Sequence, residues 1–234
     1  MPFSASKRVI PPPVELAPII ATCGRPRESD ADDNGESSSS ASQRRAMNGS
    51  NKSPPSFLGE QPMVSVVVKN CQRSIQTIPI HKNFICYYSL YFEAALNNNF
   101  VEGQTQEVQL DDVDHEVFNL FVTWIYGQKI RSSESEKLDI NIILNLWLLA
   151  DRLLVPKLQN EAMNYLFSQN CDPKTMGTNT INSAYALTLK GSPLRLYIAE
   201  FSCTALSPDR AIISDELPRE LLEDIIACLL KKNT

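Results

Sequence analysis

The most informative part of the chain is residues 81–92, which read HKNFICYYSLYF. His81 directly follows an expected strand and precedes a helix of apolar residues. Ser89 is placed to cap a second helical turn, because its hydroxyl can accept a hydrogen bond from a backbone N–H of that turn. Tyr91 and Phe92 follow at helical spacing. Aromatic side chains in such a position, beside alanine and leucine, predict a packed core rather than an exposed stacking platform.

Three short strands are predicted on either side of this segment. Residues 64–68 place valines two apart, which is typical of a strand with one buried face. Residues 78–80 place two isoleucines around Pro79, and this indicates an edge strand because proline has no N–H to donate. Residues 108–110 give a third strand. Three strands make a small sheet that helices must cover on at least one face, so the predicted fold class is α+β.

Two long helices are expected after the third strand. The first is capped by Asp112 or Asp114, repeats apolar residues at helical spacing from Phe118, and closes at Gly127. The second covers residues 142–154, and its apolar residues lie on nearly every side. A helix of that kind packs on more than one face, so we expect it at the centre of the domain.

Further helices are expected toward the C-terminus. Pro156 starts one of them, at the first helical position, where a missing N–H costs little. Ser192 and Pro193 are typical of the cap and first residue of another. Pro218 opens the last helix, which needs a buried apolar stripe to pack on its neighbours. The expected stripe consists of Leu222, Ile225, Ile226 and Leu229.

The N-terminal part of the chain has a different composition. Residues 1–62 hold nine of the fifteen prolines, and residues 1–56 contain a single aromatic residue, Phe3. Such a segment cannot bury enough apolar area to offset the entropy lost on ordering. We therefore predict a disordered, low-complexity tail over residues 1–56.

The composition excludes several classes of function. A net charge of −5 and a pI of about 5.2 argue against a protein that binds nucleic acid directly, because phosphate binding needs a clustered positive surface. The chain lacks a run of the roughly eighteen apolar residues that a membrane helix requires, and its first residues do not form a secretory signal. We expect an intracellular protein, in the cytoplasm, the nucleus or both, without membrane contact.

Catalytic, cofactor and metal sites are not expected either. The six cysteines form no C-x-x-C pair and are expected to be reduced and mostly buried. Neither a phosphate-binding glycine loop nor a serine-nucleophile motif occurs. His81 fits a buried histidine with satisfied ring nitrogens better than a base or ligand, and His115 fits a solvent-facing residue of a first helical turn. Helix capping explains the nearby carboxylates better than a calcium loop does. These carboxylates are Asp111, Asp112, Asp114 and Glu116.

Residues 81–92 resemble the His-Lys … Ser-x-Tyr-Phe signature of the BTB/POZ domain. Further motifs of that family follow in the family's order and spacing, at residues 100–102, 108–112, 118–127 and 146–154. The resemblance covers residues 57–168 and implies the BTB/POZ fold, a small three-stranded sheet covered by a cluster of helices.

The resemblance gives the expected organisation of the chain. A BTB/POZ domain over residues 57–170 follows the tail of residues 1–56, and a helical C-terminal extension occupies residues 171–234. Within the extension, residues 191–195 and 217–220 resemble the tail of the short, single-domain BTB proteins of fungi.

The resemblance also implies a protein-interaction module without cofactor, and two uses stay open. In the first, the domain is an adaptor or substrate receptor that docks on the cullin scaffold of a ubiquitin ligase. The family's cullin contact includes a hydrophobic-x-acidic motif, and Phe100 and Glu102 fall at that place, with Tyr126 a further candidate for the same surface. An aromatic anchor beside one charge suits a small, specific interface. The structural alternative is that Phe100 closes the core at a helix end and Glu102 is solvated.

In the second use, the domain binds itself or another BTB chain and serves as a scaffold or transcriptional co-regulator. Family dimers commonly exchange an N-terminal strand. Here residues 53–59 make a poor strand, and Met63 stands where the family often has an aspartate. These departures argue against a strand-exchanged dimer, whereas a homodimer or a heterodimer through helices stays open.

Overall fold

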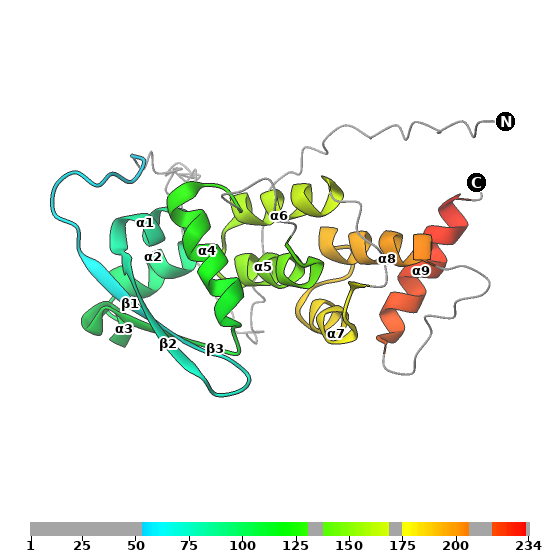
Figure 1. Cartoon of the computed structure of the whole chain (residues 1–234), viewed down its shortest axis with the longest axis horizontal. Helices are drawn as coiled ribbons and strands as arrows, with labels where there is room; N and C mark the ends of the chain where they lie inside the picture. Colours follow the sequence, from blue (N-terminus) through cyan, green and yellow to red (C-terminus); the bar gives the residue numbers. More distant parts are fainter. Residues whose placement is uncertain (1–52, 131–137, 169–174, 206–216, 233–234) are drawn as a thin grey trace, which may run out of the picture. The chain divides into compact units, whose positions relative to one another are not determined.

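The structure is a computed structural model that describes residues 53–130, 138–168, 175–205 and 217–232 (Figure 1). Residues 1–52, most of the expected tail, lie outside the described residues. The same holds for residues 169–174, where the boundary between domain and extension is expected. None of the described helices is long and apolar enough to cross a membrane.

A mixed sheet of three strands is built from β1 (Met63–Lys69), β2 (Ile75–His81) and β3 (Glu107–Asp111), in the order β2-β1-β3. β1 pairs antiparallel with β2 and parallel with β3. The parallel pairing is possible because the chain passes through three helices between β2 and β3. The side chains on the inner face are fully buried, as the alternation predicted. They include Val64, Val66, Val68, Val108 and Leu110.

β2 lies at the edge of the sheet, as Pro79 predicted. Pro79 is paired with Ser65 of β1, and β2 has a neighbouring strand on one side only. A residue without an N–H is tolerated in such a strand. The turn that leads into β2 is closed by Asn70, whose side-chain oxygen accepts a hydrogen bond from the backbone N–H of Ser74 (2.9 Å).

Three short helices follow β2: α1 (Lys82–Tyr88), α2 (Leu90–Asn97) and α3 (Val101–Thr105). Ser89, between the first two, is fully buried. Its hydroxyl oxygen accepts a hydrogen bond from the backbone N–H of Phe92 (3.2 Å) and donates one to the carbonyl oxygen of Leu153 (2.6 Å). The predicted cap is therefore confirmed, and it also ties α2 to the loop that follows α5.

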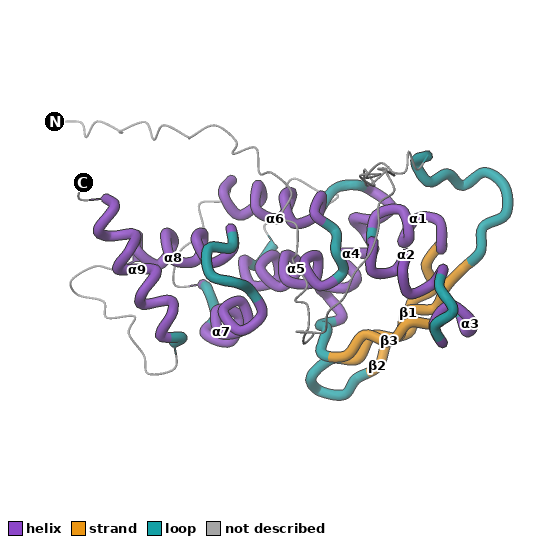
Figure 2. Tube along the Cα trace, turned by 180° about the vertical axis from the view of Figure 1, so that it is seen from behind, coloured by secondary structure: helices purple, strands orange, loops and turns teal. Residues whose placement is uncertain are grey.

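The helix after β3 is α4 (His115–Gly127). Asp114 caps it by accepting a hydrogen bond from the backbone N–H of Glu116 (2.8 Å), so Asp114 rather than Asp112 is the cap. The helix ends at Gly127, as predicted. α1, α2 and α4 lie over the same face of the sheet (Figures 1 and 2).

α5 (Ile140–Arg152) is the central helix, and α6 (Pro156–Ser168) follows it. Eight of the thirteen residues of α5 are buried, because α4, α6 and α7 all pack against it. Both views place α5 between these neighbours (Figures 1 and 2). The apolar residues on nearly every side of this segment correctly predicted its central place.

Three helices form the described part of the C-terminal extension: α7 (Thr178–Leu187), α8 (Pro193–Ala205) and α9 (Arg219–Lys232). α7 packs on α5 and α8, and α8 packs on α9. Arg195 of α8 is buried, and its guanidinium donates hydrogen bonds to the carbonyl oxygens of Tyr185 and Thr188 and to the Thr188 hydroxyl. This cation therefore fastens α8 to the end of α7.

The stripe expected on α9 is wrong in part. Leu221 (1% exposed) and Ile225 face the neighbouring helices, whereas Ile226 (57% exposed) and Leu229 lie outside. Successive helical residues are rotated by about 100°, so the two sets lie on adjacent sides of one broad apolar surface. Helical spacing finds such a surface, but which part is covered depends on where α8 lies.

The cysteines also differ from expectation. Among the four that the structure describes, Cys203 is buried, Cys86 and Cys228 are half-buried, and Cys71 is exposed in the turn between β1 and β2. The prediction that most cysteines are buried is therefore wrong for the described residues. Cys71 is exposed because the polar turn places it outside the sheet.

Candidate functional site

Phe100 and Glu102 lie together at the start of α3. Phe100 is the N-cap residue, and its carbonyl oxygen accepts hydrogen bonds from the backbone N–H groups of Gly103 (3.1 Å) and Gln104 (3.2 Å). Its side chain is 58% exposed and stands beside exposed Val101, while Glu102 is half-buried. The structural alternative, in which Phe100 closes the core, is therefore wrong. The ring faces solvent.

The position of α3 is fixed by a close backbone approach. A Cβ atom on Gly103 would lie 2.1 Å from the carbonyl oxygen of Asn98, so only glycine fits there. Gln106 ends the helix in the left-handed conformation (φ 55°). Its side-chain nitrogen donates hydrogen bonds to the carbonyl oxygens of Gly103 (2.5 Å) and Leu96 (3.3 Å). The end of α2 and the start of α3 therefore form one rigid corner below Phe100.

Tyr126 belongs to a different cluster. It lies in the last turn of α4 and is partly exposed. Its phenol oxygen accepts a hydrogen bond from the backbone N–H of His81 (3.1 Å) and lies 2.8 Å from Nδ1 of the same residue. The bond ties the end of α4 to the junction of β2 and α1. The prediction for His81 is confirmed in part, because the residue is half-buried and Tyr126 is the partner of one ring nitrogen, Nδ1.

A residue ahead of the sheet completes this cluster. The ring of Phe57 lies 4.5 Å from that of Phe84, 5.4 Å from that of His81 and 6.2 Å from that of Tyr126, measured between centroids. Phe57 is itself 61% exposed, whereas Phe84 beneath it is 6% exposed. We name His81, Phe84 and Tyr126 the aromatic seat, because together they receive the Phe57 ring.

The segment that carries Phe57 is held by hydrogen bonds, and we name residues 56–62 the N-terminal strap. Nδ2 of Asn83 donates to the carbonyl oxygen of Ser56 (2.8 Å) and to Oε1 of Gln61 (3.1 Å). Nε2 of Gln61 donates to the carbonyl oxygens of Ser56 and Leu58, each at 3.1 Å. The strap is thus ordered against α1 without forming a strand.

Sequence reasoning missed this arrangement. It examined residues 53–59 only as a strand and found them poor, and the structure agrees that no strand lies in that stretch. The available signal was an aromatic residue and a leucine, Phe57 and Leu58, inside an otherwise polar and proline-rich segment. A side chain of that kind needs an apolar neighbour, but the sequence does not say which one.

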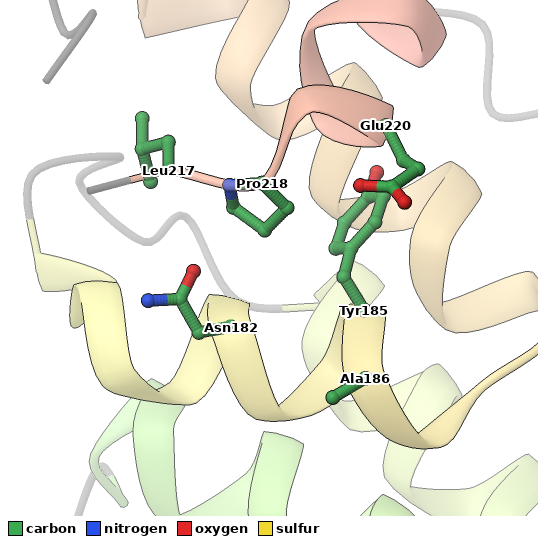
Figure 3. A pocket seen from close by; sticks show the side chains of 6 residues that line it. All are labelled: Asn182, Tyr185, Ala186, Leu217, Pro218 and Glu220. Carbon is green, nitrogen blue, oxygen red and sulfur yellow. The ribbon is translucent and has the colours of Figure 1, made fainter. Parts of the chain in front are cut away.

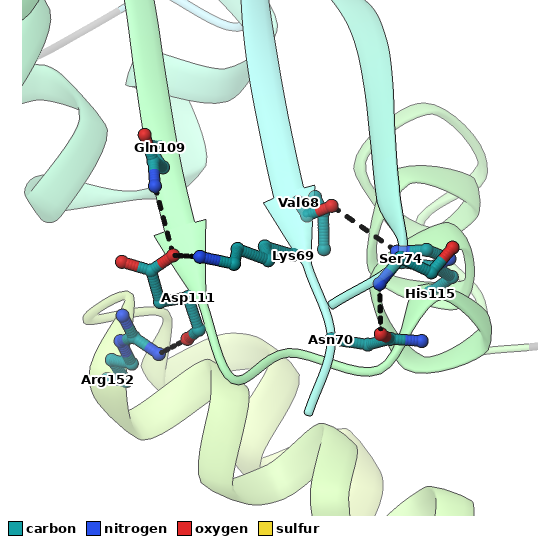
Figure 4. A network of polar contacts seen from close by, with 8 residues as sticks. All are labelled: Val68, Lys69, Asn70, Ser74, Gln109, Asp111, His115 and Arg152. Carbon is teal, nitrogen blue, oxygen red and sulfur yellow. Dashed lines mark hydrogen bonds and ion pairs between the residues drawn. The ribbon is translucent and has the colours of Figure 1, made fainter. Parts of the chain in front are cut away.

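The polar network at the other end of β1 is structural (Figure 4). His115 is half-buried with Nε2 3.3 Å from the carbonyl oxygen of Val68, so the expected solvent-facing position is wrong. The carboxylate of Asp111 lies 4.0 Å from the Lys69 ammonium, and its carbonyl oxygen accepts a hydrogen bond from Arg152 (2.8 Å). Within the described ranges, no three His, Cys, Asp or Glu side chains are grouped so that they could hold a metal ion.

A shallow hollow of about 290 Å³ lies between α7 and the start of α9 (Figure 3). Beside it, the Tyr185 hydroxyl donates a hydrogen bond to Asp224 (3.1 Å). Burial, and next the negative charge of Asp224, raise the pKa of Tyr185. The phenol therefore stays protonated and acts as a structural donor between α7 and α9. The hollow is lined by Asn182, Tyr185, Ala186, Leu217, Pro218 and Glu220.

Comparisons with known proteins point to one family. The BTB/POZ domain family model matches residues 61–170. Kelch-like protein 40 of Xenopus tropicalis is 25% identical over 179 residues, which cover 69% of this chain and 28% of the relative. Kelch-like protein 40 of Xenopus laevis is 24% identical, with the same coverage. The chain thus spans less than a third of the length of these relatives.

A similar structure has also been solved. It is the BTB (Tramtrack and Bric a brac) domain of human gigaxonin, with 22% sequence identity and a TM-score of 0.33. The similarity covers 44% of this chain and 75% of that one.

Proposed function

Because residues 61–170 form a BTB/POZ domain, a protein–protein interaction module, we propose that the chain is a non-catalytic adaptor that docks on the cullin scaffold of a ubiquitin ligase. The docking surface is the start of α3, where Phe100 and Glu102 stand at the place of the family's hydrophobic-x-acidic contact. The observation that carries the proposal is the solvent-facing ring of Phe100 on a rigid corner.

Phe100 has the properties of an interface anchor. Aromatic side chains that become buried near the centre of an interface dominate its binding energy. Phe100 and Val101 are adjacent and exposed, so a partner that covers both removes apolar surface from water. The corner held by Gly103 is already ordered, and this lowers the entropy lost on binding.

Glu102 supplies the charge of the motif. It is half-buried in the first turn of α3, two residues after the exposed Phe100. A carboxylate beside an apolar anchor attracts a basic partner group and fixes the register of docking. We expect Glu102 to govern specificity and salt dependence more than total affinity.

The proposal is tested by titrating the full chain with a purified cullin N-terminal domain in a calorimeter. Phe100→Ala should weaken binding by about tenfold or more, as for an interface hot spot. Glu102→Lys should also weaken binding, and the loss of affinity should be larger at low salt than at high salt, because the new charge repels the partner's basic group.

Leu189→Ala serves as the matched control, since Leu189 is also apolar and exposed but lies between α7 and α8. It should bind as the unmodified chain does. Equal affinity of the unmodified chain, Phe100→Ala and Glu102→Lys would contradict the proposal.

A second candidate function is an oligomeric BTB scaffold or transcriptional co-regulator without a cullin link. The exposed apolar residues of α9, Ile226 and Leu229, favour it, because such a surface is commonly covered in an assembly. Light scattering coupled to size-exclusion chromatography decides between them. The scaffold would be favoured if the chain is a dimer that Ile226→Ser and Leu229→Ser convert to monomers, and if the chain does not bind a cullin.

We also propose the boundaries of the domain and the place of the protein in the cell. The domain is taken to span residues 57–170 and the extension residues 171–234, with the chain of the short, single-domain type found in fungi. The tail of residues 1–56 and the helical segment of residues 174–234 are the two candidates for holding a substrate. The protein would act inside the cell, in the cytoplasm or the nucleus. Recovery of the partner with and without residues 1–56 would show whether the tail contributes to recognition.

A further inference from the structure

The N-terminal strap packs Phe57 against Tyr126, the third candidate residue for the cullin contact, and we propose that the strap is a displaceable cover that regulates docking at Tyr126. Phe57 occupies the aromatic seat and competes there with an apolar side chain of the partner. The inference rests on the proposed function, because Tyr126 belongs both to the seat and to the candidate cullin contacts.

Phe57 is placed so that it can leave the aromatic seat. Its ring is nearly parallel to that of Tyr126 (18° between planes) and packs closest to Phe84 (4.5 Å between centroids). Phe84 is 6% exposed under this cover, although more than half of Phe57 faces water. Phe57 therefore covers the aromatic seat while most of its own side chain stays exposed to solvent. A side chain in that position can leave without opening the core.

The hydrogen bonds that hold the strap can be exchanged for bonds to water. Besides the Phe57–Phe84 ring contact, the strap is joined to the side chain of Asn83 in α1, which donates hydrogen bonds to the carbonyl oxygen of Ser56 and to Oε1 of Gln61. The bond to Ser56 is exposed and the bond to Gln61 is partly buried, and water can replace the partners of both when the strap lifts. The backbone is anchored at the far end, where the N–H of Lys82 donates to the carbonyl oxygen of Pro62 (2.8 Å). The strap can thus swing out while β1 stays in the sheet.

The aromatic seat stays formed after the strap is released. Tyr126 contacts Phe57 but is hydrogen-bonded to His81, so its ring keeps its place when Phe57 leaves. Release would uncover Phe84 and the adjoining face of Tyr126, a preformed aromatic surface at the end of α4. Such a surface favours an apolar or aromatic partner side chain over a charged one.

Two variants of the full chain release the strap in different ways. Phe57→Ala removes the competing ring. Asn83→Asp removes the donor to Ser56 and Gln61 but retains the Oδ1 atom that accepts the backbone N–H of Phe84 (2.9 Å), so α1 keeps its first-turn bond. Leu58→Ala is the matched control, because Leu58 is the neighbouring strap residue and is almost fully exposed.

Two measurements read out the result. Hydrogen exchange at residues 56–62 reports whether the strap is docked, and calorimetry with a purified cullin N-terminal domain reports its effect on binding. We expect faster exchange of the strap and about threefold to tenfold tighter binding for Phe57→Ala and Asn83→Asp, because a larger fraction of the chain is competent to bind. Leu58→Ala should change neither.

The outcomes separate the inference from the proposed function. If the unmodified chain binds through Phe100 while both strap variants bind equally or more weakly, the regulatory role is overturned and the adaptor function stands. If the unmodified chain and both variants fail to bind, both are overturned. Slow exchange of the strap in Asn83→Asp would also overturn the inference, since the strap would then not be held by Asn83.

Discussion

The helices around α5 and the C-terminal helix α9 use their apolar residues in different ways. α5 has eight buried residues among thirteen and is surrounded by three helices. α9 is also amphipathic, yet it packs mainly on α8, and only Leu221 and Ile225 of its apolar residues are buried. The helix that is apolar on nearly every side therefore lies in the core, and the helix with one apolar stripe is only half covered.

The comparison teaches that apolar spacing reports what a helix can bury and not what it does bury. In α5 the two largely coincide, because α4, α6 and α7 cover most of its surface. In α9 Ile226 and Leu229 remain at the surface. The stability of the fold should therefore depend strongly on the helices around α5 and weakly on the outer side of α9.

The largest effect is expected for Phe118→Ala in α4. Phe118 is fully buried and lies 5.6 Å from the ring of Phe121, so its removal leaves a cavity in the core. The free energy of unfolding should fall by about 3–5 kcal/mol, measured by urea denaturation. Ile226→Ala, on the outer side of α9, is the control and should cost less than about 0.5 kcal/mol. Equal losses in the two variants would break the comparison.

An intermediate effect is expected for Arg195→Met, which keeps the apolar stem but removes the guanidinium that binds Tyr185 and Thr188. Two buried carbonyl oxygens would lose their donors, at a cost of about 1–3 kcal/mol in the same assay. Arg219→Met is the control, because Arg219 is exposed and its pair with Glu223 (3.8 Å) should contribute less than about 0.5 kcal/mol. A loss no larger than in the control would show that α8 does not depend on this cation.

The smallest effect is expected in the alkaline range. Burial and the charge of Asp224 raise the pKa of Tyr185 above its ordinary value. This stabilisation is complete below the unfolded pKa of about 10 and is lost as the pH rises toward the higher folded pKa, by about 1 kcal/mol at pH 11.

Urea denaturation between about pH 9 and 11 checks this effect, since that range brackets the unfolded pKa. Tyr185→Phe should flatten the alkaline decline in the free energy of unfolding. Asp224→Asn should lower the pKa of Tyr185 toward its ordinary value and flatten the decline in part. Identical slopes in all three proteins would rule out Tyr185 as the titrating group.

Much of the fold could be predicted because its signals are local. The valines of residues 64–68 alternate within one strand, and Ser89 and Asp114 cap helices that begin at the next residue. The edge position of β2 follows from Pro79 alone. Each of these features depends on atoms a few residues apart, so the sequence contains the whole argument.

The rest depends on contacts between distant residues. Phe57 packs on Tyr126, His115 meets the carbonyl of Val68, and α9 is covered only where α8 lies. For the candidate site, the motif located Phe100 and Glu102, but the exposure of the ring could not be derived from it. The sequence grouped Tyr126 with them, whereas the structure gives it the strap and His81 as partners.

Gly103 has a consequence for protein engineering. The backbone of the preceding helix fills the space where a side chain would begin, so this corner accepts one residue type only. The neighbouring positions can be rewritten to present another chemistry at the same point in space. A redesigned recognition surface should therefore vary the neighbouring exposed residues and keep glycine at position 103.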